Sequence, residues 1–165
     1  MVSPGAKTYA DDINDVADAT TGKPLVRLVQ AVAQSMPDNT VTALTFTTEE
    51  IDTHGFHDTG ANTQRITPTV AGYYRFTGCY MSGAMTTPAS RTTYVRKNGT
   101  TAIAPGPRDA GGALTSSKEC TALVSMNGTT DYVELIGQQD SAGAVNTVVS
   151  SQQASVFECV FERPL

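Results

Sequence analysis

Apolar and polar residues alternate along most of the chain after Pro24, with the two-residue period that places successive side chains on opposite faces of a β-strand. Every second residue of Cys120–Met126 is apolar. Near the C-terminus, Ala154–Glu162 places Phe157, Cys159 and Phe161 on one face and acidic residues on the other. The pattern therefore predicts half-buried strands.

Turn signals separate these segments. Asn98-Gly99 and Asn127-Gly128 are dipeptides typical of tight hairpin turns. Leu25–Ser35 fits a helix as well as a strand, but the prolines on both sides favour a strand. The further expected strands are Val41–Thr47, Asn62–Thr67, Gly72–Met81, Arg91–Lys97, Thr100–Ala104 and Asp131–Gln138. About eight to ten short strands predict a single all-β domain, a sandwich or a jelly roll, over residues 25–165.

Residues 1–24 have a different pattern. Thr8 and Asp11 have the spacing of a helix capping box, and Ala10, Ile13 and Ala17 lie on one narrow helical stripe with Val16 at its edge. The candidate anchoring residues are Tyr9, Ile13 and Val16. A helix this short is ordered only when it docks on another surface. We expect residues 1–24 to form an anchoring arm that includes a short helix.

Composition and charge exclude several classes of function. Threonine-rich, charge-poor sequences favour strands, and charged residues make up only 16% of this chain. The net charge is −5 and the 11 Lys and Arg residues are scattered, which argues against binding to nucleic acid. We expect no membrane insertion, because no apolar run approaches about 20 residues. The N-terminus lacks the apolar core of a signal peptide, so we expect synthesis in a cytoplasm.

One polar segment could carry chemistry. Glu49–Thr63 is expected to be a loop, and it contains both histidines, His54 and His57, beside Asp52 and Asp58. Such side chains can hold a divalent metal. The alternative, which the turn residues favour, is a hydrogen-bonded loop that the two aspartates brace. We expect no cofactor, because no nucleophile motif or phosphate-binding loop occurs. The three cysteines, Cys79, Cys120 and Cys159, are expected to be free thiols in the core.

Gly72–Met81 is the most aromatic segment of the chain. Its two faces both carry large side chains: Tyr74, Phe76 and Tyr80 on one, and Tyr73, Arg75 and Cys79 on the other. A small sandwich buries only one face of each sheet. Either a partner, most simply a second copy of the chain, covers the outer face, or that face is a tyrosine-decorated surface in solvent.

The order of several motifs resembles the jelly-roll head shared by complement globular heads and tumour necrosis factor-like proteins. The motifs are Ile66-Thr67-Pro68, Gly72-Tyr73-Tyr74-Arg75-Phe76, Arg96-Lys97-Asn98-Gly99-Thr100, Asp131-Tyr132-Val133-Glu134-Leu135 and Ser155-Val156-Phe157. The segments 9–14, 34–46 and 51–58 are similar to segments of such heads on tailed bacteriophage particles. The chain departs from the pattern at Asn127–Thr130, and no collagen stalk precedes the head, which argues against a long fibre.

The resemblance implies a non-enzymatic homotrimer whose inner aromatic residues meet near a threefold axis. Its candidate trimer or core residues are Tyr74, Phe76, Tyr80, Val133, Leu135, Phe157 and Phe161. It further implies a location on a phage virion surface, after synthesis in the bacterial host cytoplasm, with attachment to capsid or tail proteins through residues 1–24. A capsid decoration protein is one expectation. A tail-tip or baseplate appendage that binds a host receptor or surface glycan, through loops at 49–63, 82–90 and 105–117, is the alternative.

Overall fold

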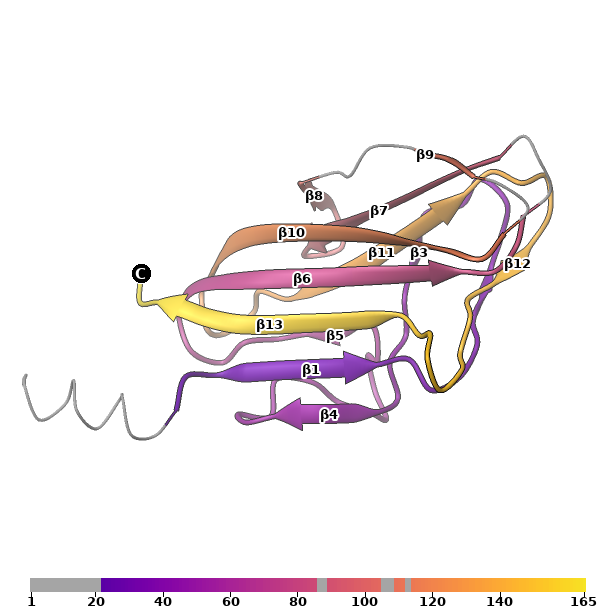
Figure 1. The fold of residues 1–165 in the computed structure, drawn as a ribbon. Helices are drawn as coiled ribbons and strands as arrows, with labels where there is room; N and C mark the ends of the chain where they lie inside the picture. The colour runs from indigo at the N-terminus through magenta and orange to yellow at the C-terminus, as the bar shows by residue number, and fades with distance from the viewer. Residues whose placement is uncertain (1–21, 86–88, 105–108, 112–113) are drawn as a thin grey trace, which may run out of the picture.

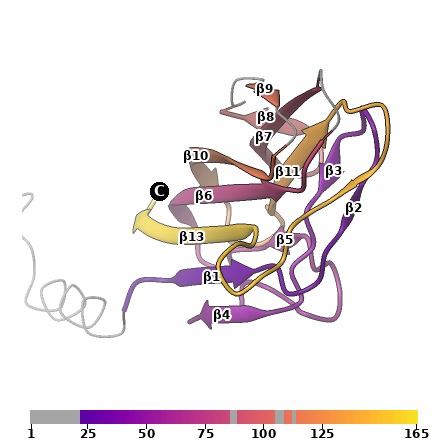
Figure 2. The same ribbon diagram turned by 45° about the vertical axis from the view of Figure 1, so that its right-hand side comes forward.

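The computed structural model describes residues 22–85, 89–104, 109–111 and 114–165, and in this part of the chain all regular elements are β-strands. Two antiparallel sheets lie face to face (Figures 1 and 2). The expected all-β antiparallel class is therefore confirmed. Residues 1–21 of the expected arm, with Tyr9, Ile13 and Val16, lie outside the described residues. No helix able to span a membrane is found among the described residues.

The first sheet has five strands in the order β10-β6-β13-β1-β4. The bounds of these strands are β1 (Leu25–Val29), β4 (Glu49–Asp52), β6 (Gly72–Ser82), β10 (Ser116–Met126) and β13 (Val156–Arg163). The long strand β6 pairs with β10 along its whole length, from Gly72 opposite Met126 to Ser82 opposite Ser116. Its other edge pairs with β13, which brings the C-terminal strand into the centre of the sheet.

The second sheet has the strand order β3-β11-β7-β8, with β5 also paired to β11 and β9 also paired to β7. Its strands are β3 (Thr42–Ala43), β5 (Arg65–Ile66), β7 (Ala89–Lys97), β8 (Thr101–Ile103), β9 (Asp109–Gly111) and β11 (Val133–Gln139). A separate short pair joins β2 (Ser35–Met36) to β12 (Val145–Asn146).

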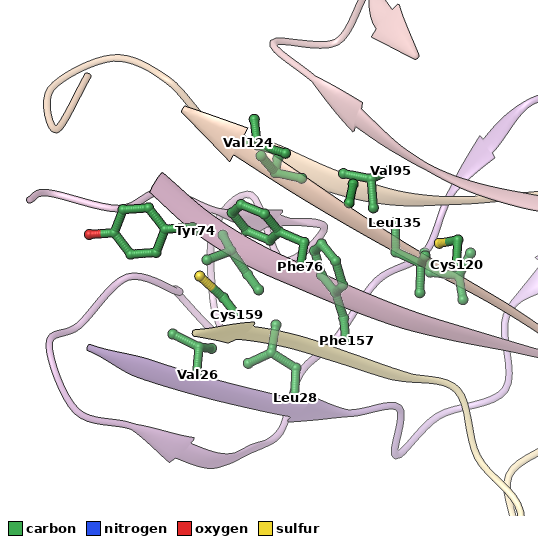
Figure 3. Packing of buried hydrophobic residues seen from close by; sticks show 14 of the residues in the cluster. Val26, Leu28, Tyr74, Phe76, Val95, Cys120, Val124, Leu135, Phe157 and Cys159 are labelled. Atoms are coloured by element: carbon green, nitrogen blue, oxygen red, sulfur yellow. The ribbon is translucent and has the colours of Figure 1, made fainter. Parts of the chain in front are cut away.

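The core lies between the two sheets, where the inward rows of both meet (Figure 3). Phe157 packs its ring 5.9 Å from the ring of Phe76 and 6.2 Å from that of Phe46. Tyr74 is fully buried and donates its hydroxyl to the Val70 carbonyl at 2.8 Å. Burial of this phenol raises the pKa of Tyr74 to about 12, so it stays a neutral donor.

The three cysteines are free thiols, as the sequence predicts. Cys120 and Cys159 lie in the core, and burial raises the pKa of both thiols. Cys79 differs from the expectation, because it is only half-buried and lies on the outward side of β6. The two-residue period of the strand explains this placement, since Gly78 and Tyr80 on either side of it face inward.

The two sheets interlock at two glycines. A Cβ atom on Gly78 of β6 would overlap the side chain of Leu135 on β11. In the opposite direction, a Cβ on Gly137 of β11 would lie only 3.2 Å from the ring of Tyr80 on β6 and 2.9 Å from Met36. Each strand therefore has a glycine where the facing strand inserts a large side chain.

Some sequence predictions at the sheet edges are wrong. Glu49–Asp52 was expected in a loop but forms strand β4 at the edge of the first sheet. Three of its four residues are exposed, so the strand lacks the alternation of buried and exposed residues from which a strand is predicted. The expected loop at 105–117 contains β9 and the start of β10. The segment Leu25–Ser35 is a strand only as far as Val29 and again, in β2, from Ser35.

Replacing Gly78 with alanine is expected to destabilise the fold by about 1–3 kcal/mol, because the added methyl group forces Leu135 out of its place in the core. The matched control is Gly143→Ala, where an added Cβ would have no atom within 4 Å. Urea denaturation of both variants measures the difference. Equal unfolding free energies for the two variants would show that the sheets do not interlock at Gly78.

Candidate binding site

The histidine-containing loop is held together by its own polar side chains. Asp52 accepts hydrogen bonds from the backbone amides of His54, at 3.2 Å, and His57, at 2.9 Å. Asp58 accepts from the amides of Gly60, at 2.8 Å, and Ala61, at 3.0 Å, and these bonds lower the pKa of its carboxyl group. The two aspartates thus brace the backbone on either side of His57.

His57 is buried, and both of its ring nitrogens face backbone carbonyl groups. Nδ1 lies 2.7 Å from the carbonyl oxygen of Arg65, and Nε2 lies 3.0 Å from that of Phe46. His54 is exposed, and its Nδ1 lies 2.8 Å from the Thr53 hydroxyl. Within the described ranges, no group of three His, Cys, Asp or Glu side chains is placed to hold a metal ion. The geometry therefore favours the braced loop over the metal site.

The candidate trimer or core residues lie inside a single subunit. Six of them are 0% exposed: Tyr74, Phe76, Tyr80, Val133, Leu135 and Phe157. Phe161 is partly buried and packs its ring 5.2 Å from that of Tyr74. The expectation that these aromatic residues meet near a threefold axis is therefore wrong, because the packing of the two sheets already buries them.

Asp131 joins the two Asn-Gly turns of the chain. Its carboxylate accepts from the side-chain amide of Asn98 at 2.8 Å, from Lys97 Nζ at 2.7 Å and from the backbone amide of Asn127 at 3.0 Å. Burial by itself raises the pKa of Asp131, but these hydrogen bonds outweigh it and hold the pKa below the ordinary 3.8. Tyr132 follows directly and donates its backbone N–H to Asn98 Oδ1 at 3.0 Å.

A hollow of about 490 Å³ lies between the braced loop and this pair of turns. Its walls come from residues 55–69 on one side and from Thr130 and Tyr132 on the other. Within it, the guanidinium carbon of Arg65 lies 3.9 Å from the centroid of the Tyr132 ring. The hollow therefore combines a positioned cation with polar loop residues, a combination typical of sites for small polar ligands.

Comparison with known proteins identifies the fold. No family model matches the sequence, and no curated protein matches it either. Among solved structures, murine APRIL at pH 5.0 has a TM-score of 0.59 at 12% identity, with 86% of this chain and 100% of that chain covered. Eiger TNF from S. frugiperda has a TM-score of 0.52 at 8% identity, over 87% of this chain and 96% of that one. The chain has the tumour necrosis factor-like jelly-roll fold. At these identities the likeness shows the fold alone.

Sequence reasoning pointed to one wall of the hollow of this jelly roll, the loop at 49–63, but missed Arg65 and its contact with Tyr132. Arg65 and Tyr132 are far apart in the chain, and they meet because β5 pairs with β11 and places Arg65 opposite Glu134. Neither residue lies in a motif that signals binding. The Asn-Gly signal at 127–128 indicated a turn beside the hollow rather than a ligand site.

Replacing Asp131 with asparagine is expected to destabilise the jelly roll by about 1–3 kcal/mol near pH 7, because the charged acceptor of three hydrogen bonds is lost. The folded-state pKa lies below the unfolded value, so the ionised carboxylate stabilises the fold above about pH 4. This contribution is lost as the pH falls through the folded pKa. The difference from the wild type should therefore shrink between about pH 5 and pH 2 in urea titrations.

The control for this experiment is Glu119→Gln on β10, which removes an equal charge from an exposed position. It should leave the unfolding free energy almost unchanged at each pH. A loss in Asp131→Asn no greater than that in Glu119→Gln would contradict the role of Asp131 in joining the turns.

Proposed function

We propose that this chain is a non-enzymatic structural protein of a tailed bacteriophage virion, a homotrimer that decorates the capsid surface and is attached through residues 1–24. The phage assignment rests on the motif resemblance alone, and the tumour necrosis factor-like jelly-roll fold agrees with the kind of head that this resemblance implies. Self-association is supported by one feature of the structure, the outward side of the five-stranded sheet. No cofactor or metal enters the proposal.

This surface, called the outer face below, carries apolar side chains that solvent reaches. Leu123 on β10 is 61% exposed, Ile51 on β4 is 39% exposed and Val160 on β13 is 37% exposed. Leu123 and Val160 both lie opposite Arg75 of β6, on its two sides. Half-buried apolar residues on the same side of the sheet include Leu25, Val29, Tyr73, Met81 and Val156.

The strand pairing places apolar side chains of the outer face opposite one another. Leu25 lies opposite Val160, and Val29 lies opposite Val156. The ion pair of Arg27 with Glu158 lies between these two apolar pairs, and Arg75, whose Nη2 is 2.6 Å from Glu162, lies between Leu123 and Val160. A surface that mixes exposed apolar side chains with charged groups is common in protein–protein interfaces. A second copy of the chain is the simplest partner, because closed symmetry then covers every such face.

The mass in solution tests this assembly. A homotrimer has three times the 17.3 kDa mass of the subunit, which light scattering coupled to size exclusion can measure. Leu123→Glu is expected to weaken assembly about tenfold or more, because a charge replaces an apolar side chain in the contact. The matched control is Leu114→Glu, since Leu114 is 77% exposed and lies outside the outer face. A wild-type monomer at micromolar concentration would refute the trimer.

The anchoring role of the arm has its own test. Deleting residues 1–24 removes the segment before β1 and leaves the strands of both sheets intact. We expect the truncated protein to keep the solution mass of an assembled head but to be lost from purified particles, as measured by immunoblotting against a capsid protein. Incorporation equal to that of the full chain would exclude attachment through the arm.

A second candidate function is recognition of a host receptor or surface glycan by a tail-tip or baseplate appendage. The hollow between residues 55–69 and Tyr132 supports it, because part of its wall is the loop that the sequence offered for this role. The other two expected binding loops, at 82–90 and 105–117, include residues 86–88, 105–108 and 112–113, which lie outside the described residues.

A further inference from the structure

Arg65 is held in a fixed orientation at the hollow. Its backbone belongs to β5 and pairs with Glu134 of β11. Its guanidinium group lies over the Tyr132 ring at 3.9 Å, and its Nε lies 4.0 Å from Glu134 Oε1. The backbone of Tyr132 is in turn held by two hydrogen bonds to Asn98: its carbonyl accepts from the Asn98 backbone N–H, and its N–H donates to Asn98 Oδ1. A cation stacked on an immobilised ring loses little conformational freedom when it binds a ligand.

The Nε donor of this guanidinium is unused. Among the residues that the structure describes, none accepts a hydrogen bond from Arg65 Nε, which is shielded from solvent. Glu134, the nearest carboxylate, has its Oε2 at 2.9 Å from both Nε and Nη2 of Arg96. The side chain of Arg65 is 33% exposed, so its outer edge remains open to the hollow. An oriented guanidinium with a 4.0 Å ion pair to Glu134 can pair its exposed outer edge with a carboxylate.

The remaining lining offers partners for hydroxyl groups. Thr67, Thr69 and the side-chain amide of Asn62 line the hollow, and no intramolecular hydrogen bond to these side chains occurs in the described ranges. Asp58 uses only Oδ1 to brace the loop, so Oδ2 can accept from a ligand hydroxyl. The volume of about 490 Å³ lies within the range of about 300–1,000 Å³ usual for small-ligand sites.

Charge distinguishes the possible anions. Arg65 faces the hollow as a cation, while Asp58 also lines it and Glu134 lies behind Arg65, 4.0 Å from its Nε. A phosphate, with nearly two negative charges, would be repelled by these carboxylates more strongly than a singly charged ligand. A single carboxylate on a ring that carries several hydroxyl groups matches both the cation and the polar lining.

We infer that the hollow binds a carboxylate-bearing sugar, with the carboxylate on the guanidinium of Arg65 and the hydroxyl groups on Asn62, Thr67, Thr69 and Asp58. Recognition of such a sugar rests on the second proposed function, glycan binding, and is independent of trimer assembly. The site brings together loop 55–69 and Tyr132, so it exists only in the folded jelly roll.

Isothermal titration of the full-length protein with D-glucuronate tests the site, with D-glucose, acetate and inorganic phosphate as comparison ligands. We expect glucuronate to bind more tightly than each of the other three. Arg65→Gln should weaken glucuronate binding about tenfold or more, because a charge-assisted pair of hydrogen bonds is lost. The matched control is Arg163→Gln, since Arg163 lies over the ring of Tyr73, 4.8 Å from its centroid, and does not line the hollow.

Thr69→Val provides a second variant that does not depend on the fold tolerating a change at Arg65. Its hydroxyl is exposed and makes no hydrogen bond within the described part of the chain, so the variant should fold normally. We expect glucuronate binding to weaken about three- to tenfold, through the loss of one hydroxyl contact.

Several outcomes would overturn the inference. Equal affinity for glucose and glucuronate, or equal affinities of Arg65→Gln and Arg163→Gln, would exclude Arg65 as the carboxylate-binding residue. Acetate or phosphate binding as tightly as glucuronate would exclude recognition of the sugar ring. Binding of a neutral saccharide that Arg65→Gln leaves unchanged would refute the proposed site but not the proposed glycan-binding function. Failure of every saccharide on a glycan array to bind would refute the site and the glycan-binding function together.

Discussion

The close approach of β6 and β11 is the constraint on which the sandwich depends. Leu135 fills the space that Gly78 leaves open, and the ring of Tyr80 occupies the space beside Gly137. Because the two glycines lie on facing strands of different sheets, each sheet inserts a large side chain into the space beside the other sheet's glycine. The packing is therefore directional, and it fixes how the two sheets are placed relative to each other. The aromatic contacts around Phe157 depend on this spacing.

Tight packing between the sheets determines which surfaces are left for partners. The inward rows of β6, β10 and β13 are almost completely buried in one subunit, so assembly cannot use them. Among the apolar residues that remain exposed, Ile51, Leu123 and Val160 share the outer face, where Leu123 and Val160 flank Arg75. Other exposed apolar residues, such as Val32 and Leu114, lie outside the strands of this sheet. The outer face is therefore the part of the five-stranded sheet where apolar side chains can meet a partner.

Alternation predicted the fold best where one face of a strand is buried and the other is more exposed, as in β6, β10 and β13. The Asn-Gly dipeptides predicted turns at Asn98 and Asn127, and both residues lie in turns of the structure. Two kinds of feature could not be predicted. Edge strand β4 is mostly exposed and has no burial pattern, and the contact of Arg65 with Tyr132 depends on pairing between distant segments. Local sequence carries no signal for such a contact.

A single strand connects the core to the hollow. In β11, Val133 and Leu135 belong to the core, while Glu134 between them pairs with Arg96 and lies beside Arg65. The two-residue period therefore lets one strand support both the packing and the cation of the hollow. A shift of β11 by one residue in register would move Glu134 into the core and Leu135 out of it. The core packing and the contact of Glu134 with Arg65 would then both be lost. The hollow shares no residue with the outer face, so assembly through that face would leave Arg65 open to a ligand.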